Sequence, residues 1–188
     1  TANVIVHVGA TPVFADVDPA TGNLDPAAVD AATTSRTRAV IPVHYAGRPV
    51  DVRAFRRLAD HHELTLVEDA AHCIEGVADG LKIGTTADFT CFSFYATKNI
   101  TTGEGGMVTT ASEAAAERIR IASQHGMTRP AWSRYQAVQP SRYDVVTPGF
   151  KYNMTDLQAA IGLHQLAAID RHAARRRAIA TCYDHLCD

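Results

Sequence analysis

An acidic residue and a lysine each follow an apolar run in this chain. Asp69 lies two residues after the end of the run at residues 64–67, and Lys98 lies just beyond the run at residues 89–94. Chemistry with pyridoxal phosphate (PLP) needs an amine that holds the aldehyde of the cofactor as a Schiff base. It also needs a carboxylate that keeps the ring nitrogen protonated, so that the ring acts as an electron sink. The pair predicts such a site, with Lys98 as the amine and Asp69 as the carboxylate.

Each residue also has an ordinary interpretation. Asp69 stands where it would cap a short helix starting at Ala70. A lysine in a loop is usually solvated, but Lys98 is flanked by uncharged residues at 92–97 and 99–103. A desolvated lysine has a lowered pKa, and the free amine is the nucleophile of Schiff-base chemistry. The two segments taken singly leave both interpretations open.

Hydroxyl groups and glycines near Lys98 are suited to binding a phosphate. Ser93, Thr97 and the turn at residues 103–106 offer hydroxyls and unobstructed backbone N–H groups, although glycine-rich turns connect strands in many proteins. The turn lacks the later glycine of a dinucleotide fingerprint and leads into a strand, which argues against a Rossmann phosphate loop. His72 and Cys73 fit no zinc spacing, so we expect no metal site.

The composition is that of an ordinary globular protein. The chain has 188 residues, of which 46% are hydrophobic and 20% charged, and its net charge is −2. No long basic run indicates a nucleic-acid partner. The basic cluster of Arg171 and residues 175–177 is interpreted as a solvated helix face. Four cysteines without a C-x-x-C pair, and no apolar run long enough to span a bilayer, predict a cytoplasmic protein.

Strands and helices alternate along the chain. Strands are expected at 12–17, 39–43, 64–67, 89–94 and 106–110, and helices at 26–32, 52–62, 112–123, 155–170 and 171–188. Residues 4–8 read as a strand, but the run is too short to exclude a helix. Residues 76–84 are expected to be a turn and residues 125–150 a long loop. The alternation predicts an α/β fold with a mostly parallel sheet and helices on both faces.

Several segments together resemble the DegT/DnrJ/EryC1/StrS family of PLP-dependent sugar aminotransferases. They lie at residues 41–47, 67–72, 92–99, 103–106 and 148–160, in the order of the family. They extend over nearly the whole chain, and as a set they are highly specific. Within the family the chain is most similar to enzymes that make UDP-4-amino-4-deoxy-L-arabinose and to related aminotransferases of UDP-linked sugars.

The resemblance implies the large domain of a type I aminotransferase and a homodimer with shared active sites. Lys98 would form the internal aldimine and later move a proton, while Asp69 would bind the pyridine nitrogen. His72 would help to seat the cofactor, and Ser93 would bind its phosphate. Asn153 would reach the phosphate in the neighbouring subunit. The implied reaction moves an amino group from glutamate to a nucleotide-linked 4-keto-sugar, with UDP as the expected nucleotide.

The family continues beyond both ends of this sequence. Residues 1–165 are therefore expected to be the central part of a PLP-binding large domain. Residues 166–188 are expected to be a helical segment that leads toward a small domain outside the chain. A fragment of this kind is expected to bind PLP weakly and to turn over little. The resemblance also reassigns residues 2–8 to a helix.

Two rival functions remain. A PLP-dependent sugar dehydratase of the same family has histidine in place of the lysine, so Lys98 argues against it. A non-catalytic domain that only binds a ligand or partner stays open, because the motifs are intact in both cases. The sequence does not name the sugar, and the loop at residues 125–148 is expected to contribute to its recognition.

Overall fold

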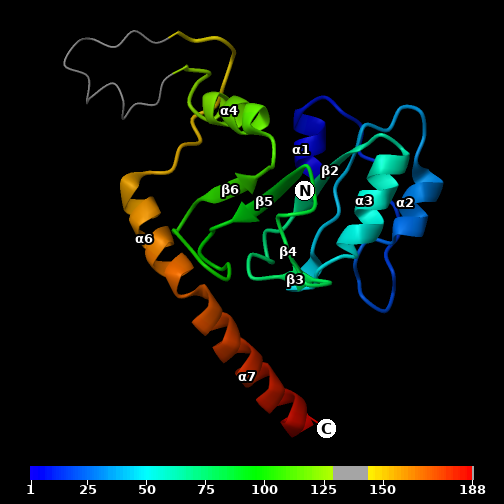
Figure 1. The fold of residues 1–188 in the computed structure, drawn as a ribbon, viewed down its shortest axis with the longest axis vertical. Coiled ribbons are helices and arrows are strands. Elements are labelled where there is room, and N and C mark those ends of the chain that lie inside the picture. The colour runs from blue at the N-terminus through cyan, green and yellow to red at the C-terminus, as the bar shows by residue number, and fades with distance from the viewer. Residues whose placement is uncertain (129–143, 188) are drawn as a thin grey trace.

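A four-stranded sheet forms the centre of the molecule. In this computed structural model, which describes residues 1–128 and 144–187, the strands lie in the order β1-β2-β5-β6 (Figure 1). Their bounds are β1 Ala39–Val40, β2 Thr65–Asp69, β5 Phe89–Ser93 and β6 Gly106–Thr109. The first three are parallel and β6 is antiparallel to β5. The sheet is mostly parallel, as predicted.

Two helices pack together over the first half of the sheet. Helix α2 (Pro26–Ala32) contacts α3 (Val52–His61), and α3 lies against β2. Asp51 caps α3, with its Oδ1 accepting a hydrogen bond of 2.8 Å from the Ala54 N–H. The apolar face predicted for this helix is buried in the core and consists of Val52, Phe55, Leu58 and Ala59. The period of 3.6 residues therefore placed this helix correctly.

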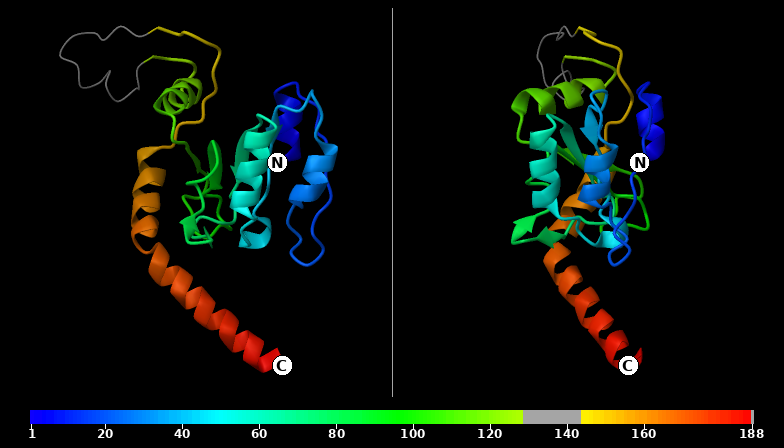
Figure 2. Two further views of the ribbon diagram at one scale, coloured as in Figure 1. Left: turned by 45° about the vertical axis from the view of Figure 1, so that its right-hand side comes forward. Right: turned by 90° about the vertical axis from the view of Figure 1, so that its right-hand side faces the viewer.

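Helix α1 (Ala2–His7) lies on the other side of the sheet from α3, as Figures 1 and 2 show. The β-branched residues at 4–8 are typical of a strand, whereas the family resemblance predicted a helix, and the helix is correct. None of the residues of α1 is buried. The backbone N–H groups of residues 8–10 donate hydrogen bonds to carbonyls of the helix and close its end.

The strand predicted at residues 12–17 is absent. Within the described residues this segment makes only an isolated bridge, between Val17 and Leu24. Val13 and Phe14 remain 72% and 79% exposed. A strand requires a neighbour for its backbone N–H and C=O groups, and no strand of the described sheet lies beside this one. The strand prediction was wrong here because residue type indicates which side chains suit a strand, but does not show whether a second strand is available for pairing.

Residues 76–84, predicted to be a turn, contain a small hairpin instead. Strand β3 (Val77–Ala78) pairs in antiparallel fashion with β4 (Leu81–Lys82). Asp79 and Gly80 between them both have positive φ, at 50° and 77°. That backbone is typical of the tight turns whose twist matches a hairpin. The prediction found the turn and missed the four residues that pair across it.

The proline in the predicted strand at 39–43 marks its end. Strand β1 stops at Val40, and pairing with β2 resumes only at the bridge between Val43 and Asp69. Strand β1 is also terminal in the sheet order. Both findings agree with the expectation that Pro42, which lacks an N–H, lies at a strand end or sheet edge.

Three helices form the rest of the described chain. Helix α4 (Glu113–Ala122) is capped by Ser112, and α6 (Asp156–Ala167) begins with the predicted capping box at Thr155. Helix α7 (Ile169–Cys187) follows and extends away from the sheet (Figure 1). Most of the predicted loop, residues 129–143, lies outside the described residues. No helix of the described chain is long and apolar enough to cross a membrane.

Candidate active site

The predicted carboxylate and lysine follow neighbouring parallel strands. Asp69 is the last residue of β2 and is paired with Cys91 of β5, two residues before Ser93. Lys98 lies in the turn after β5, where its backbone N–H donates to the Tyr95 carbonyl at 2.9 Å. Carboxyl ends of parallel strands share one edge of a sheet, and ligands of α/β folds bind there. The fold therefore brings Asp69, Ser93 and Lys98 to the same edge.

Hydrogen bonds orient Asp69 at both its backbone and its side chain. The Asp69 N–H donates to the Pro42 carbonyl at 2.9 Å, and the His44 N–H donates to the Asp69 carbonyl at 3.1 Å. The Oδ2 atom accepts from the Thr1 hydroxyl at 2.5 Å, and Oδ1 accepts from the Ala71 N–H at 3.1 Å. Each oxygen has a further lone pair, and the residue is partly exposed. The carboxylate is held in place and can still accept from a ligand.

The thiols near Asp69 are neutral. Burial raises the pKa of Cys91, and the neighbouring Asp69 carboxylate raises it further. Burial also raises the pKa of Cys73 from 9.0 to about 11, with smaller contributions from Glu75 and Glu68. Neither thiol is therefore a thiolate nucleophile at neutral pH. Within the described residues, no group of three or more His, Cys, Asp or Glu side chains is arranged to hold a metal ion.

The turn that follows Asp69 carries His72 on the surface. The side chain of His72 is exposed, three residues beyond Asp69. Its backbone carbonyl lies against Gly47, where an added Cβ would come within 2.9 Å of that oxygen. Gly47 also has a φ of +83°, which side chains rarely adopt. The glycine thus permits the close approach of the turn at 45–47 to the turn that carries His72.

Ser93 stands at the end of β5 beside the glycine-rich turn. It is paired with Gly106 of β6, and the next residue, Phe94, donates its N–H to the Gly105 carbonyl at 2.8 Å. The Ser93 hydroxyl accepts from the Tyr95 N–H at 3.4 Å. The hydroxyl and the glycine turn therefore lie on the edge that carries Asp69.

Asn153 lies apart from the other predicted residues. Its side chain is exposed, and its Oδ1 accepts a hydrogen bond from the Lys151 ammonium. Among the described residues no contact joins Asn153 to Asp69, Ser93 or Lys98. Its expected role concerns a second copy of the chain, so the position within a single chain does not test it.

A buried polar group under the site was not predicted. His44 and Glu68 are each 1% exposed, and the Thr90 hydroxyl donates to Glu68 Oε2 at 2.8 Å. His44 Nδ1 accepts from the Val50 N–H, so the neutral ring carries its hydrogen on Nε2, which lies 3.8 Å from Glu68 Oε2. The two-residue period of β2 was an available signal, since it turns Glu68 into the core when Asp69 faces outward.

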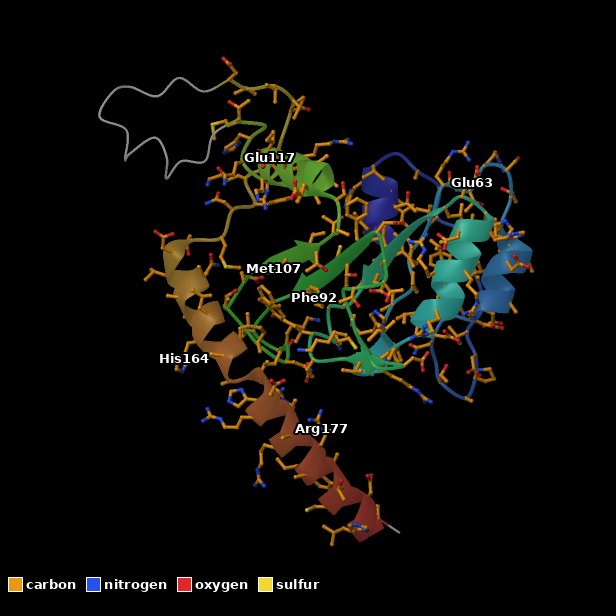
Figure 3. The ribbon with its side chains drawn as sticks, in the orientation of Figure 1. Glu63, Phe92, Met107, Glu117, His164 and Arg177 are labelled. Atoms are coloured by element: carbon orange, nitrogen blue, oxygen red, sulfur yellow. The ribbon has the colours of Figure 1, made fainter. Side chains whose placement is uncertain are left out.

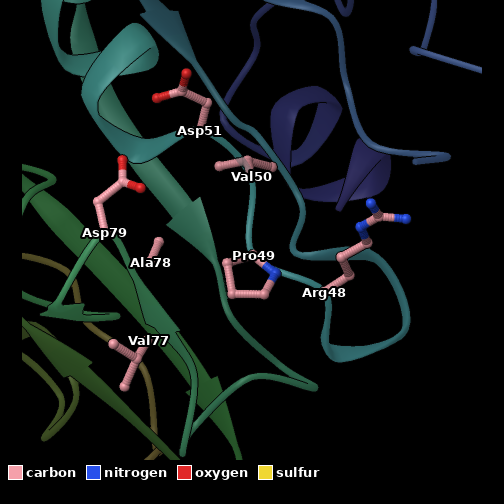
Figure 4. A pocket seen from close by; sticks show the side chains of 7 residues that line it. All are labelled: Arg48, Pro49, Val50, Asp51, Val77, Ala78 and Asp79. Atoms are coloured by element: carbon pink, nitrogen blue, oxygen red, sulfur yellow. The ribbon is translucent and has the colours of Figure 1, made fainter. Parts of the chain in front are cut away.

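A shallow hollow lies between the segments at 48–51 and 77–79 (Figure 4). Two short segments face each other across it, and Asp51 and Asp79 bring their carboxylates to one end. None of the residues predicted for the site lines it. The hollow is therefore separate from the sheet edge that carries the candidate active site.

The whole chain from residue 1 to residue 187 matches the model of the DegT/DnrJ/EryC1/StrS aminotransferase family, and the chain belongs to that family. It is 51% identical over 183 residues to the spore coat polysaccharide biosynthesis protein SpsC of Bacillus subtilis. That match covers 97% of this chain and 47% of SpsC. The chain thus spans about half the length of the curated relatives it matches.

Solved structures agree with the family. The putative sugar aminotransferase Spr1654 from Streptococcus pneumoniae, in its PMP form, superposes with a TM-score of 0.88 at 35% identity, covering 97% of this chain and 51% of Spr1654. DesI, solved in the presence of its TDP-sugar product, gives a TM-score of 0.76 at 38% identity, covering 90% of this chain and 40% of DesI. The fold is accordingly that of a type I PLP-dependent aminotransferase large domain, of which this chain forms a part.

Proposed function

We propose that this chain forms the central part of a PLP-dependent aminotransferase that moves an amino group from glutamate to a nucleotide-linked 4-keto-sugar. The observation that carries the proposal is the meeting of Asp69, Ser93 and Lys98 at one sheet edge. Family membership supports the reaction class. Spr1654, which has been solved in PLP and PMP forms, and DesI, with its TDP-sugar product, support the cofactor and the kind of substrate.

The residues at the edge fit PLP. Asp69 is an oriented carboxylate with a neutral thiol neighbour, so it can pair with a protonated ring nitrogen. One of its oxygens also accepts a hydrogen bond from the Thr1 hydroxyl. Ser93 offers a hydroxyl to the phosphate, and the Lys98 amine is within the same edge. PLP, when bound, supplies an electron sink for negative charge at the carbon next to the transferred nitrogen.

Each side chain then has a distinct task. Asp69 would accept the hydrogen bond of the ring N–H and would keep that nitrogen protonated. The Lys98 amine would hold the aldehyde group of the cofactor and, once free, would act as the base and acid that moves a proton during amino transfer. His72 would help to seat the cofactor, and Ser93 would bind its phosphate. Asn153 reaches the phosphate site of a second copy in a homodimer.

The surrounding assignments follow from the same proposal. Residues 1–165 are the central part of the PLP-binding domain, and residues 166–188 lead toward a small domain. The protein acts in the cytoplasm, and UDP is the expected nucleotide of the sugar. The match to a protein of spore coat polysaccharide biosynthesis supports a role in making a polysaccharide.

Borohydride reduction of the chain with PLP tests the role of Lys98. We expect the covalent label to map to Lys98 by mass spectrometry, because its amine follows β5 at the edge shared with Asp69. Lys82 and Lys151 serve as internal controls, since both are exposed and neither belongs to the turn after β5. A label on either of these in place of Lys98 contradicts the assignment.

The variant Asp69→Asn tests the carboxylate. We expect the label at Lys98 to persist while amino transfer falls by at least about 100-fold, because a neutral amide does not hold a protonated ring nitrogen. Transfer is measured in a chain that includes the remaining length of its relatives. Unchanged transfer in Asp69→Asn would falsify the pyridinium role.

The incomplete length favours one alternative. A chain that spans about half of its relatives can bind PLP or a partner chain without turnover. Absence of the label at Lys98 would favour this alternative, and so would a chain that takes the label but transfers no amino group. The dehydratase of this family is disfavoured by the lysine at position 98.

A further inference from the structure

Three segments of the chain meet at Glu75, Asn99 and Arg176. Glu75 belongs to the turn that follows Asp69, Asn99 is the residue after Lys98, and Arg176 lies on α7. The Asn99 Nδ2 donates to Glu75 Oε1 at 2.6 Å. Arg176 donates from one nitrogen to the Asn99 carbonyl at 2.6 Å and from the other to Glu75 Oε1 at 3.4 Å. The cluster thus ties both halves of the proposed site to one helix.

The cluster is largely removed from water on its acidic side. The Glu75 side chain is 18% exposed, and its Oε2 is buried with no partner among the described residues. A buried carboxylate is costly unless donors compensate for the lost hydration. Asn99 and Arg176 are those donors. Arg176 is exposed, as the predicted solvated face requires, and the contact with Glu75 and Asn99 adds a role that the sequence did not predict.

Neighbouring side chains of α6 hold the same turn further along. The Thr101 N–H donates to the Gln165 side-chain oxygen at 2.9 Å. The Gln158 amide donates to the Glu104 carbonyl at 2.9 Å. Side chains of α6 thus contact residues 104 and 101 of the segment after Lys98, and Arg176 of α7 contacts residue 99. Arg176 makes the contact that lies nearest to Lys98.

We propose that Glu75, Asn99 and Arg176 form a positioning cluster that sets the place of Lys98 relative to Asp69. The inference rests on the proposed function. PLP is a rigid ring whose nitrogen and aldehyde are engaged at once, so the carboxylate and the amine must stay at a matching separation. Misplacement of a reacting group by about 1 Å costs on the order of 100-fold in rate. The cluster acts through Lys98 and touches neither the cofactor nor the substrate.

The test compares two neighbouring arginines of α7. Arg176→Met keeps an apolar stem and removes the donors. Arg177→Met, at the position labelled in Figure 3, is the matched control, because no hydrogen bond or ion pair of its side chain occurs within the described residues. Arg176→Lys is a second variant that keeps the charge without the planar fork of donors. Arg176 is 46% exposed, so we expect each variant to fold.

Two measurements are made on each variant. Amide hydrogen exchange of Lys98 and Thr102 is followed without PLP, since both N–H groups bond within the turn. The concentration of PLP that half-saturates Lys98 labelling is then measured after borohydride reduction. In Arg176→Met we expect exchange about 10-fold faster and labelling that needs about 10-fold more PLP. Arg176→Lys should show a smaller change, and Arg177→Met should match the unmodified chain.

The outcomes separate this inference from the proposed function. Unchanged exchange in Arg176→Met overturns the cluster as a support of the turn. Faster exchange with unchanged labelling overturns its role in positioning Lys98 and leaves only a structural contact. Both of these failures occur while the unmodified chain still takes the label. No label on Lys98 in the unmodified chain instead overturns the proposed function, and the inference with it.

Discussion

Helices α3 and α6 show two ways in which a helix is held in this protein. Helix α3 buries four side chains in the core beside β2. Helix α6 is richer in leucine and alanine, yet none of its residues is buried, and Leu157 and Leu163 are 81% and 70% exposed. Gln158 and Gln165 of this helix form hydrogen bonds with residues 104 and 101, in the segment after Lys98. The number of apolar residues therefore does not decide which helix is buried. A helix is buried where its apolar face lies against another apolar surface of the protein, as that of α3 does.

Truncating one apolar side chain in each helix gives the sharpest contrast. Phe55→Ala removes a ring that is 1% exposed, and we expect a loss of about 3–5 kcal/mol in the free energy of unfolding. Leu157→Ala on α6 should change it by less than about 0.5 kcal/mol, because the side chain is already in water. Denaturant unfolding measures both. Similar losses in the two variants would show that α6 is packed in solution as α3 is.

A buried and an exposed cysteine extend the comparison to the pH dependence of stability. Cys73 lies in the core cluster with a pKa raised to about 11, and Cys182 of α7 is exposed. Above pH 9 the unfolded chain releases the Cys73 proton while the folded chain keeps it, so stability falls as the pH rises toward 11. A shift from 9.0 to about 11 corresponds to about 2–3 kcal/mol.

Urea unfolding between pH 8 and pH 11 measures this loss. Cys73→Ala should flatten the decline above pH 9, although the small cavity lowers stability at every pH. Cys182→Ala should leave the decline unchanged. An equal slope in all three proteins would remove Cys73 as its source.

Helix caps give the smallest expected effect. Asp51→Ala and Thr155→Ala each remove one side-chain acceptor at a helix start, worth about 1 kcal/mol. Because α3 belongs to the core, we expect Asp51→Ala to lower the global stability. Thr155→Ala should mainly speed amide exchange in the first turn of α6. Global destabilisation by both, seen in thermal unfolding, would mean that α6 and α3 unfold together.

Local patterns predicted the elements whose signals are contained in the element itself. The spacing of Val52, Phe55, Leu58 and Ala59 identified α3, and the Thr155 capping box marked the start of α6. The apolar run at 89–94 gave strand β5 within one residue of its end. These signals depend on period and on side-chain bonds to nearby backbone, so they need no information about distant segments.

The sequence missed structural features that depend on which other segment of the chain lies beside a residue. Residues 12–17 have strand-forming side chains and no adjacent strand in the described fold. The sequence analysis gave Glu68 no role, and the structure places it against His44 and Thr90 in the core. The sequence grouped Arg176 with the other arginines of its helix. Its hydrogen bond to the Asn99 carbonyl depends on where α7 lies and was not predicted. The neighbours of Glu68 and of Arg176 come from more than 20 residues away in the sequence.

The sequence by itself determined the chemical groups and their family. Asp69 and Lys98 are the right types for PLP, and their flanking motifs place the chain among sugar aminotransferases. Only the tertiary structure decided how they are brought to one place. Parallel pairing of β2 with β5 aligns the ends of the two strands, and Glu75, Asn99 and Arg176 link the turns beyond them. The reason is physical, because strand register and long-range hydrogen bonds depend on which segments meet in space, which no local pattern contains.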